Sequence, residues 1–440
     1  MAALDRSQAV SFIRSANFTR TFGRISRVMA TYFEADGPVV PTGTVCVCPG
    51  RESETYAEVV RAEVGRITLM PYSDTLGLTP GDRIHAAPRG NRVPVGSPLL
   101  GRVVNALGHP LDKGPAIQGA SEAPLMGTAS MALDRVNPRA PLHTGVRAID
   151  TLLTLGIGQR AGIFASSGVG KTSLLTQLAR QVNADYVVIC LIGERGREAQ
   201  NFWYEALSDS ARARSVMVVS TSDEPAIMRA RAAWFALAQA EHLRAGGRHV
   251  LLLLDSVTRF AMALREVGLA AGEPPTLRAY PPSVFAALPK LVERCGQFAD
   301  GSAISALMTI LAETDDVDDP LSETMRSLLD GHIVLSRELA EQGHFPAIHV
   351  PRSTSRLLQH VTSAAEQSLS RDAVASLSLF EASRPLIESG LYAAGSNPRL
   401  DEAMRIRPEL AAFLQQDSVP THREEALGRL RAILGSPAAR

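Results

Sequence analysis

Short stretches of alternating apolar and polar residues make up the chain between about residues 20 and 94. They include RISRVMATYF, TVCVCP and RITLMPY, and glycine, proline and aspartate residues separate them. Short β-like runs at such close spacing are typical of a small all-β barrel or sandwich. We therefore predict an N-terminal β domain over residues 1–94.

The apolar pattern changes to longer units between residues 145 and 349. Strand candidates such as RAGIFA, DYVVICLIG and HVLLLLD each precede a helical pattern, and ISALMTILAE and HIVLSREL add two further strand candidates. Strands that alternate with helices predict a mainly parallel sheet with helices on both faces. We place this α/β domain at residues 95–356, so that it begins with a Gly- and Pro-rich linker that carries a strand candidate at Gly101–Asn105.

Beyond residue 356 the apolar spacing is helical, as in SRDAVASLSLFEASRPLIESGL and LDEAMRIRPELAAFLQQ. This spacing predicts a small helical domain over residues 357–440. The last helix is predicted to begin with a capping box formed by Thr421 and Glu424. The apolar side of that helix carries Leu427, Leu430 and Leu434, which we expect to pack on the domain.

The composition is that of a folded globular protein. Of the 440 residues, 45% are hydrophobic and 20% are charged, far from the composition of disordered chains. The 45 basic and 45 acidic residues cancel, which removes the general electrostatic argument for a nucleic-acid binder. The sequence has neither a signal-peptide pattern nor about 18 consecutive apolar residues, so we expect neither export nor a membrane span.

The four cysteines are too few and too scattered for a disulfide framework or a four-ligand zinc site. A reduced cytosolic compartment is therefore expected. Cys46 and Cys48 lie two residues apart in a strand-like run, where both thiols face the same side. We interpret this pair as core packing, without chemistry of its own.

The most specific chemical motif follows the apolar run Ala161–Phe164. Residues 165–172 are ASSGVGKT and a helical segment follows, which is the strand, loop and helix order of a phosphate-binding loop. Glycines let successive backbone N–H groups face the phosphates, while Lys171 would reach the β- and γ-phosphates and the Thr172 hydroxyl would hold magnesium. Only three lysines occur in the chain, so a Gly-Lys-Thr triplet in this context disfavours the alternative of a simple glycine turn.

Two further strand candidates end on carboxylates. Asp255 ends HVLLLLD, at the edge of the sheet where ligands of open α/β folds bind. We expect Asp255 to hold magnesium, and the alternative is that it only caps the helix that begins near Ser256. Glu194 follows the strand candidate Tyr186–Ile192, where a carboxylate could polarise a water that attacks the γ-phosphate. From the pattern alone, a solvated charged turn explains Glu194 equally well.

Five segments carry a resemblance that covers nearly the whole chain. They are LLGRVVNALGHPLDKG, FASSGVGKTSLL, LIGERGRE, LLLLDSVTRFAMALREVGLAAGEPPTLRAYPPSVFAALPKLVER and LLDGHIVLSRELAEQGHFPAIHVPRSTSR. In these segments the chain resembles the type III secretion system ATPases, which are closely related to the flagellar export ATPases. Both groups resemble the catalytic subunit of the rotary ATP synthase, and GERGRE and YPPSVF are typical of the export branch. The resemblance implies an α/β, RecA-like P-loop NTPase core with a mainly parallel sheet, preceded by a small N-terminal β-barrel and followed by a small helical domain.

The resemblance also implies roles for individual residues. Glu194 matches the catalytic carboxylate, Asp255 the magnesium-site aspartate, and Arg356 the arginine finger that reaches the γ-phosphate bound by the neighbouring subunit. Phe345 matches an aromatic residue that stacks on adenine, and a core phenylalanine is the alternative. The implied catalytic residues are Lys171, Glu194, Arg195, Asp255 and Arg356. The implied ATP-binding residues are Ser167, Gly168, Val169, Gly170, Lys171, Thr172, Ser173 and Phe345, and the implied Mg²⁺ ligands are Thr172 and Asp255.

The activity implied by the resemblance is Mg²⁺-dependent ATP hydrolysis at the subunit interfaces of a homohexamer. It would energise type III protein secretion by releasing chaperones and unfolding substrates at the export gate. The implied partners are a central stalk, stator and regulator proteins, the export gate, and secreted substrates with their chaperones; nucleic acid is not among them. The implied location is cytoplasmic, peripheral at the cytoplasmic face of the bacterial inner membrane, and the first 20 or so residues would serve docking or oligomerisation.

Three alternatives stay open at this point. A flagellar export ATPase has the same architecture, although YPPSVFAALPKLVER and LLDGHIVLSRELAEQGH favour the secretion system. A ring translocase on RNA or DNA shares the nucleotide core, but the zero net charge and the export-type segments disfavour it. A non-hydrolysing ring subunit is the third, and Glu194 disfavours it because a glutamine there would have indicated that role.

Three positions depart from the family pattern. Ala165 replaces the first glycine of the phosphate loop, which matters only if that position needs a positive φ. His349 stands where aspartate is common, and Met308 where an aromatic residue is common before the strand that leads to Glu313. The acidic run Glu313–Asp319 is predicted to be a solvated loop.

Overall fold

The computed structural model describes residues 21–50, 54–87, 90–127, 132–311 and 319–435. These residues form two compact units. The first holds the described residues up to Arg92, together with Pro225–Ile227 and Glu266–Pro274, and the second holds the other described residues. No described helix combines the length and apolar character that a membrane span needs. The predicted division into three domains at residues 94 and 356 stays a prediction.

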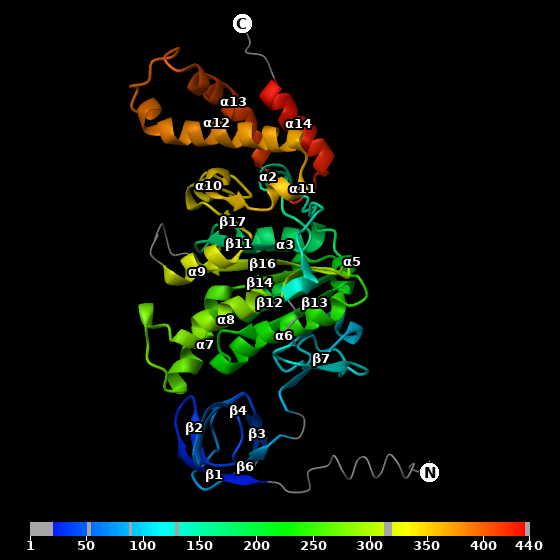
Figure 1. The fold of residues 1–440 in the computed structure, drawn as a ribbon, viewed down its shortest axis with the longest axis vertical. Coiled ribbons are helices and arrows are strands. Elements are labelled where there is room, and N and C mark those ends of the chain that lie inside the picture. Colours follow the sequence, from blue (N-terminus) through cyan, green and yellow to red (C-terminus); the bar gives the residue numbers. More distant parts are fainter. Residues whose placement is uncertain (1–20, 51–53, 88–89, 128–131, 312–318, 436–440) are drawn as a thin grey trace. The chain divides into compact units, whose positions relative to one another are not determined.

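The first unit contains a closed antiparallel barrel, drawn in blue in Figure 1. Its strands follow the order β1-β2-β5-β4-β3-β6 around the barrel. They are β1 (Phe22–Val28), β2 (Phe33–Asp36), β3 (Val45–Pro49), β4 (Glu54–Glu63), β5 (Arg66–Pro71) and β6 (Arg83–Ala86). Phe33, Leu69 and Ile84 fill its interior together with Cys46 and Cys48, whose thiols are buried and free. The predicted barrel and the packing role of the two cysteines are confirmed.

The second unit is built on a sheet whose central strands are parallel. Their order is β18-β17-β11-β16-β14-β12-β13-β8, and all neighbours from β17 to β8 run parallel, whereas β18 is antiparallel. The bounds are β8 (Arg102–Val104), β11 (Arg160–Ala165), β12 (Tyr186–Glu194), β13 (Ser215–Thr221), β14 (His249–Asp255), β16 (Ala303–Leu311), β17 (Gly331–Val334) and β18 (Thr354–Ser355). The antiparallel strands β15 (Gly296–Phe298) and β10 (Arg135–Val136) extend β16, and β7 (Arg92–Val95) pairs with β9 (Ser121–Pro124). The predicted α/β class is confirmed.

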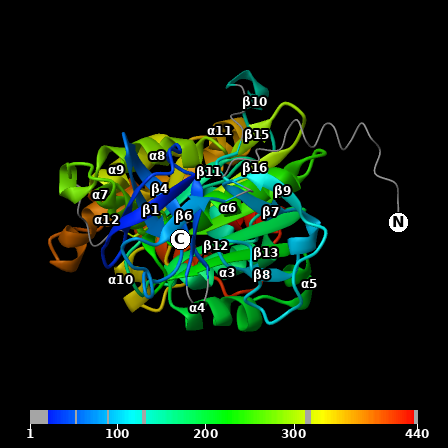
Figure 2. The same cartoon turned by 90° about the horizontal axis from the view of Figure 1, so that it is seen from below.

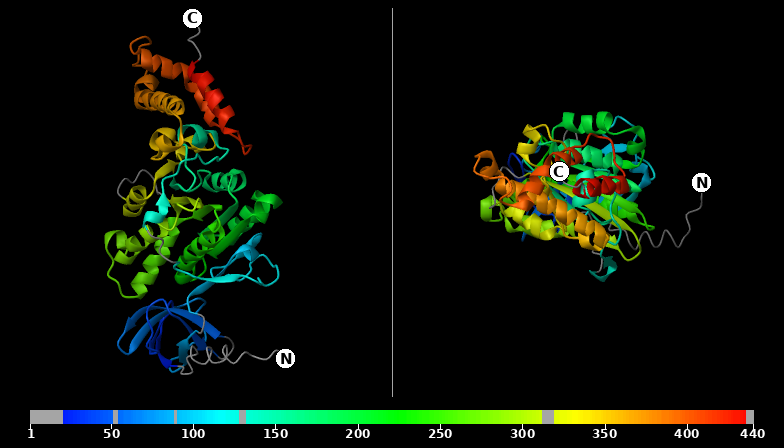
Figure 3. Two further views of the ribbon diagram at one scale, coloured as in Figure 1. Left: turned by 45° about the vertical axis from the view of Figure 1, so that its right-hand side comes forward. Right: turned by 90° about the horizontal axis from the view of Figure 1, so that it is seen from above.

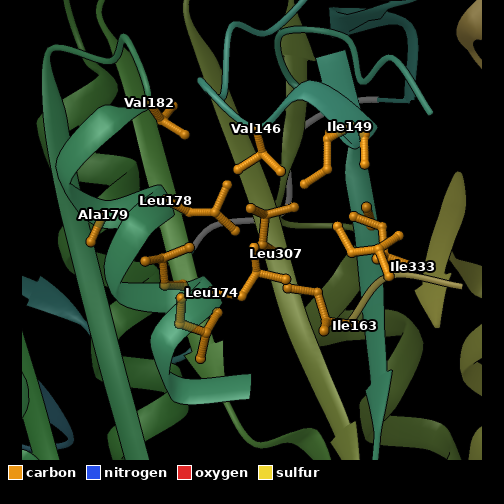
Figure 4. Close-up of a cluster of buried hydrophobic side chains, with 14 of the residues drawn as sticks. Val146, Ile149, Ile163, Leu174, Leu178, Ala179, Val182, Leu307 and Ile333 are labelled. Atoms are coloured by element: carbon orange, nitrogen blue, oxygen red, sulfur yellow. The ribbon is translucent and has the colours of Figure 1, made fainter. Parts of the chain in front are cut away.

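Helices cover both faces of this sheet. The helix α3 (Lys171–Gln181) lies on one face, and α6 (Ala226–Arg244) covers the other, which is the side viewed in Figure 2. Leu174 and Leu178 of α3 are one turn apart and face Ile163 and Leu307 of the sheet (Figure 4). The other helices before residue 353 are η1 (Ser97–Leu99), η2 (Ala132–Asp134), α2 (Arg147–Leu152), α4 (Gly196–Gln200), the π-helix η3 (Asn201–Ala206), α5 (Asp209–Ala213), α7 (Val257–Ala270), η4 (Leu277–Ala279), α8 (Pro282–Val292), α9 (Pro320–Leu328), α10 (Arg337–Glu341) and η5 (Val350–Arg352).

The C-terminal part is helical, as predicted, and Figure 3 shows these helices together at one end of the second unit. They are α11 (Leu358–Val361), α12 (Ala364–Glu388), α13 (Pro398–Leu414) and α14 (Arg423–Gly435). The buried cluster that includes the central sheet also contains Leu377 of α12, Leu410 of α13 and Leu430 of α14. In addition, α2 contacts α12, α13 and α14. A capping box formed by Ser363 and Glu366 begins α12.

The capping box predicted at Thr421 is wrong, because α14 begins only at Arg423. The Thr421 hydroxyl accepts a hydrogen bond from Arg147 Nη1 at 3.4 Å instead, so it serves a contact to α2. The apolar side of α14 is buried as predicted, through Leu427, Leu430 and, in part, Leu434.

Candidate nucleotide-binding and catalytic site

A glycine-rich loop joins the last residue of β11 to the first residue of α3. Gly168 and Gly170 have φ values of 81° and 85°, in the left-handed region that favours glycine, and Gly170 caps the helix. The first N–H groups of a helix lack partners within it and point toward the loop, where they suit a phosphate. Val169 is buried and anchors the loop in the core, while Ser167, Thr172 and Ser173 are exposed. All seven residues predicted to bind phosphate therefore lie in one contiguous loop and helical turn.

The alanine that replaces the first glycine of the motif is tolerated for a clear reason. Ala165 is the last residue of β11, pairs with Leu311 of β16 and is buried. Its extended strand conformation suits any L-residue, so the additional methyl group costs no backbone strain.

Three predicted site residues meet at the carboxyl ends of neighbouring strands. Asp255 ends β14 and Glu194 ends β12, and the two strands pair in parallel. The Lys171 Nζ donates a hydrogen bond to Asp255 and lies 3.6 Å from Glu194 Oε1. The side chains of Lys171, Glu194 and Asp255 are only 12%, 7% and 5% exposed. One ammonium therefore lies between two buried carboxylates.

Two residues that the sequence did not single out complete this cluster. Thr309 Oγ1 donates to Asp255 Oδ1 at 2.7 Å from the adjacent strand β16. Arg259 Nη2 lies 3.4 Å from Glu194 Oε2, and its other Nη donates to the carbonyl oxygen of Gly193. Arg259 lies four residues after Asp255, in the first turn of α7, and this spacing was the only signal in the sequence. Nothing in the local sequence marks Thr309.

The electrostatics of the cluster favour a proton or a cation at Glu194. Burial raises the pKa of Glu194 to about 7, with a further increase from the charge of Asp255, and Lys171 and Arg259 oppose the shift. A hydrogen bond with Glu198 acts in the same direction as burial. Two carboxylates this close cannot both ionise without compensating positive charge.

The donor set fits Mg²⁺ held jointly with phosphate, and not a metal held by protein alone. No group of three or more His, Cys, Asp or Glu side chains in the described part of the chain could hold a metal ion. Magnesium typically uses one or two carboxylates together with water and substrate phosphates. Asp255 and the exposed Thr172 hydroxyl at the start of α3 supply oxygen donors of that kind.

A pocket of about 770 Å³ opens beside the phosphate loop. Its walls include Gly170, Thr172 and Ser173, Gln177 and Arg180 of α3, Glu198, Phe202 and Glu205, Phe345 and Pro346, and Gln416, Asp417 and Ser418. Phe345 is 43% exposed, and its ring lies 3.2 Å from the point where a Cβ on Gly170 would be. A free aromatic face in this position suits stacking on a nucleobase.

The two arginines of the predicted catalytic set are not part of the cluster. Arg195 is exposed at the N-cap of α4. Arg356 donates its backbone N–H to the carbonyl oxygen of Asp330 at 2.9 Å, and Asp330 binds Arg160, the first residue of β11. The phosphate loop follows the other end of β11. The length of that strand, about 17 Å, therefore separates Arg356 from the loop.

The remaining departures have local explanations. His349 Nδ1 accepts the N–H of Arg352 at 3.2 Å, so the imidazole caps η5 as an aspartate would. Its Nε2 lies 3.3 Å from Glu381 of α12, a contact that an aspartate would make repulsive. Met308 is buried inside β16, so the expectation that it precedes the strand is wrong. Of the acidic run, residues 313–318 lie outside the described residues, and Asp319 caps α9.

The parallel sheet, the glycine loop at the start of α3 and the lysine between two strand-end carboxylates define a P-loop nucleotide-binding protein. Residues 145–355 match the model of the ATP synthase alpha/beta family, nucleotide-binding domain, and residues 362–432 that of the T3SS EscN ATPase C-terminal domain. The flagellum-specific ATP synthase of Bacillus subtilis is 41% identical over 97% of this chain and 98% of its own length. The SPI-2 type 3 secretion system ATPase of Salmonella typhimurium is 44% identical over 90% of both chains.

A solved structure supports the same family as these sequence matches. The assembled ATPase EscN from the type III secretion system of enteropathogenic E. coli superposes with a TM-score of 0.89 at 38% identity, over 94% of this chain and 100% of that chain. The chain therefore belongs to the family of type 3 secretion system ATPases and flagellum-specific ATP synthases, and it is an ATPase. The resemblance, the fold and the class of activity predicted from the sequence are confirmed.

Proposed function

We propose that this chain hydrolyses ATP with Mg²⁺ at the interfaces between identical subunits of a homohexamer and thereby energises type III protein secretion. The observation that carries the proposal is the distribution of the site residues over the sheet. Lys171, Glu194 and Asp255 meet at one end of the parallel strands, and Arg356 lies at the opposite end. An arginine that serves a phosphate loop from there must serve the loop of another subunit.

The residues around the phosphate loop have separate roles in binding the phosphates and in holding Mg²⁺. The backbone of Ser167–Ser173 would enclose the phosphates, with Lys171 moving from its carboxylate partners to the β- and γ-phosphates. Thr172 and Asp255 would hold Mg²⁺, and Thr309 fixes the Asp255 carboxylate through its hydrogen bond. When bound, Mg²⁺ supplies positive charge that stabilises the phosphate oxygens.

Hydrolysis needs a group that orients water and accepts its proton. Glu194 has a suitable place, and its raised pKa puts it near neutral pH, where a carboxylate is an effective general base. Arg259 holds one carboxylate oxygen, which leaves the other free to accept a hydrogen bond from water once Lys171 has moved. We assign Arg195 and Arg356 to charge stabilisation in the transition state, with Arg356 acting from the neighbouring subunit. Phe345 would stack on the adenine.

A ring follows from the same distribution. Each chain carries one phosphate loop and one arginine at opposite ends of β11, so each contact between chains joins unlike surfaces. Contacts of that type can close a ring of identical subunits, without any non-catalytic partner chain.

The biological assignment rests on the family. A structure of EscN in complex with its central stalk EscO, 37% identical over 94% of this chain, supports a central stalk as a partner here too. We further propose stator or regulator proteins, the export gate and secreted substrates with their chaperones as partners. Chaperone release and substrate unfolding would take place at the cytoplasmic face of the bacterial inner membrane. The proposed domains are a β-barrel (1–94), an ATPase domain (95–356) and a helical domain (357–440), with docking or oligomerisation assigned to the first 20 or so residues.

Flagellar protein export is the second candidate. A flagellum-specific ATP synthase from Salmonella typhimurium is 43% identical over 94% of this chain, against 44% for the SPI-2 ATPase. The segments YPPSVFAALPKLVER and LLDGHIVLSRELAEQGH of this chain favour the secretion system. Restoration of secretion or of motility in strains that lack the respective ATPase would decide between the two.

The division of the site between subunits can be tested by mixing inactive chains. Lys171→Ala and Arg356→Ala should each lose turnover alone, and a mixture should regain part of it, because some interfaces pair an intact loop with an intact arginine. Arg371→Ala removes an exposed arginine from α12 and serves as the matched control, with turnover expected to be unchanged. Absence of recovery in mixed rings, confirmed by co-purification, would refute an arginine that acts between subunits.

A further inference from the structure

A buried glutamine between α13 and α14 joins the pocket wall to the start of α2. Gln416 is 8% exposed. Its Oε1 accepts the backbone N–H of Arg147 at 2.8 Å, and its Nε2 donates to the carbonyl oxygens of Gly145 and Val419, each at 2.7 Å. The amide thus uses its acceptor and both donors, and these partners fix which atom is oxygen and which is nitrogen.

The backbone of the same residue holds Phe345. The N–H of Gln416 donates to the carbonyl oxygen of Phe345 at 2.8 Å. The Phe345 ring in turn lies against Gly170 of the phosphate loop, in the wall of the pocket. The location of the proposed adenine-stacking ring therefore depends on a residue that comes from between the C-terminal helices.

The segment that follows Gln416 is bound to α3. The carbonyl oxygen of Asp417 accepts from Gln177 Nε2 at 3.5 Å, and that of Ser418 accepts from Gln181 Nε2. Residues 416–418, which we call the 416–418 loop, all line the pocket. This loop and Phe345 together form a wall that is separate from the cluster of Lys171, Glu194 and Asp255.

We propose that Gln416 is a positioning residue for the nucleoside end of the substrate. By fixing Phe345 and the 416–418 loop, it sets the affinity for base and ribose and leaves the phosphate contacts at the start of α3 unchanged. The inference rests on the proposed function, in which ATP occupies this pocket with its phosphates at Lys171.

Gln416→Glu tests the idea with little change in size. The variant keeps an acceptor for the Arg147 N–H but presents oxygen to two carbonyl oxygens where Nε2 had donated, so the loop and Phe345 must move. We expect the affinity for ADP to fall about tenfold. The KM for ATP should rise by a similar factor while kcat changes by less than about twofold, because the groups that act on the γ-phosphate are untouched.

The decisive measurement compares two ligands by isothermal titration calorimetry. ADP carries the nucleoside, whereas inorganic tripolyphosphate binds only through phosphate, so its affinity should be unchanged in Gln416→Glu. The control is Gln415→Glu, the same substitution at an exposed neighbour whose Nε2 donates to the carbonyl oxygen of Gly343 at 3.1 Å. This control should bind both ligands as the wild type does.

A double-mutant cycle separates positioning from general support of the fold. In a Phe345→Ala background, Gln416→Glu should cost less than about twofold in ADP affinity, because the ring through which it acts is gone. Equal loss of ADP and tripolyphosphate affinity, full additivity with Phe345→Ala, or unchanged ADP affinity would each overturn the proposal. Gln416→Met replaces Gln416→Glu if that variant does not fold. A wild-type chain that binds no ADP would instead refute the proposed function.

Discussion

The Glu194 carboxyl leads to a prediction about stability that can be worked out in numbers. Burial and the Asp255 charge raise its pKa from 4.5 to about 7 in the folded protein. The folded protein therefore binds a proton at Glu194 more tightly than the unfolded chain does. A pKa raised by folding contributes stability that is fully present below the unfolded pKa of about 4.5 and is lost as the pH rises to about 7.

The size of the effect follows from the two pKa values. For a single group that titrates at 4.5 unfolded and at about 7 folded, the loss between pH 5 and pH 8 is about 2 to 3 kcal/mol. Solvent screening reduces a contribution of this kind, so we expect between about 1 and 3 kcal/mol. Glutamine has nearly the same shape and does not titrate. The stability of Glu194→Gln relative to wild type should therefore rise by this amount from pH 5 to pH 8.

Urea denaturation of the nucleotide-free proteins at several pH values measures this difference. The chain has two tryptophans, Trp203 and Trp234, both buried in the second unit, so their fluorescence follows the unit that contains Glu194. Glu205→Gln is the control, since it removes an exposed carboxylate from the wall of the pocket beside the phosphate loop. If the free energies of unfolding of wild type and Glu194→Gln keep a constant difference from pH 5 to pH 8, the desolvation argument is refuted.

Three further predictions concern the core and the walls of the site. Leu174→Ala removes a side chain that is fully buried between α3 and the sheet, and it should lower the free energy of unfolding by about 2 to 5 kcal/mol in the same fluorescence assay. Arg259→Met removes a cation that lowers the pKa of Glu194, so the acidic limb of the kcat/KM pH profile should move to higher pH, and Arg259→Lys should largely restore it. Gly170→Ala should weaken ADP binding more than Gly168→Ala does. Both positions have positive φ, but only at Gly170 would a Cβ meet a neighbouring ring, at 3.2 Å.

The sequence predicts those parts of the site that depend on short segments. The phosphate loop is contiguous, so its residue pattern alone defines it. Glu194 and Asp255 follow from a weaker rule, since parallel strands bring their carboxyl ends to one edge, and the two strands prove to be neighbours. The barrel and the mainly parallel sheet are likewise predicted from local patterns of apolar residues.

Other contacts depend on pairings that no local pattern contains. Thr309 reaches Asp255 only because β16 pairs with β14, and Gln416 reaches Phe345 only because the C-terminal helices pack on α2. The capping box illustrates a different limit. Thr421 matches the motif, but its hydroxyl accepts a hydrogen bond from Arg147, and α14 begins two residues later.

The geometry of β11 supports the proposal that identical chains complete one another's sites. Its last residue leads into the phosphate loop, and its first residue, Arg160, binds Asp330, which in turn accepts the backbone N–H of Arg356. A hydrogen-bonded strand in the middle of a sheet does not shorten, and its length exceeds the reach of an arginine side chain. Arg356 therefore has no route to the phosphate loop of its own chain. A protein that uses this arginine in hydrolysis must assemble first, so its specific activity should rise with its own concentration.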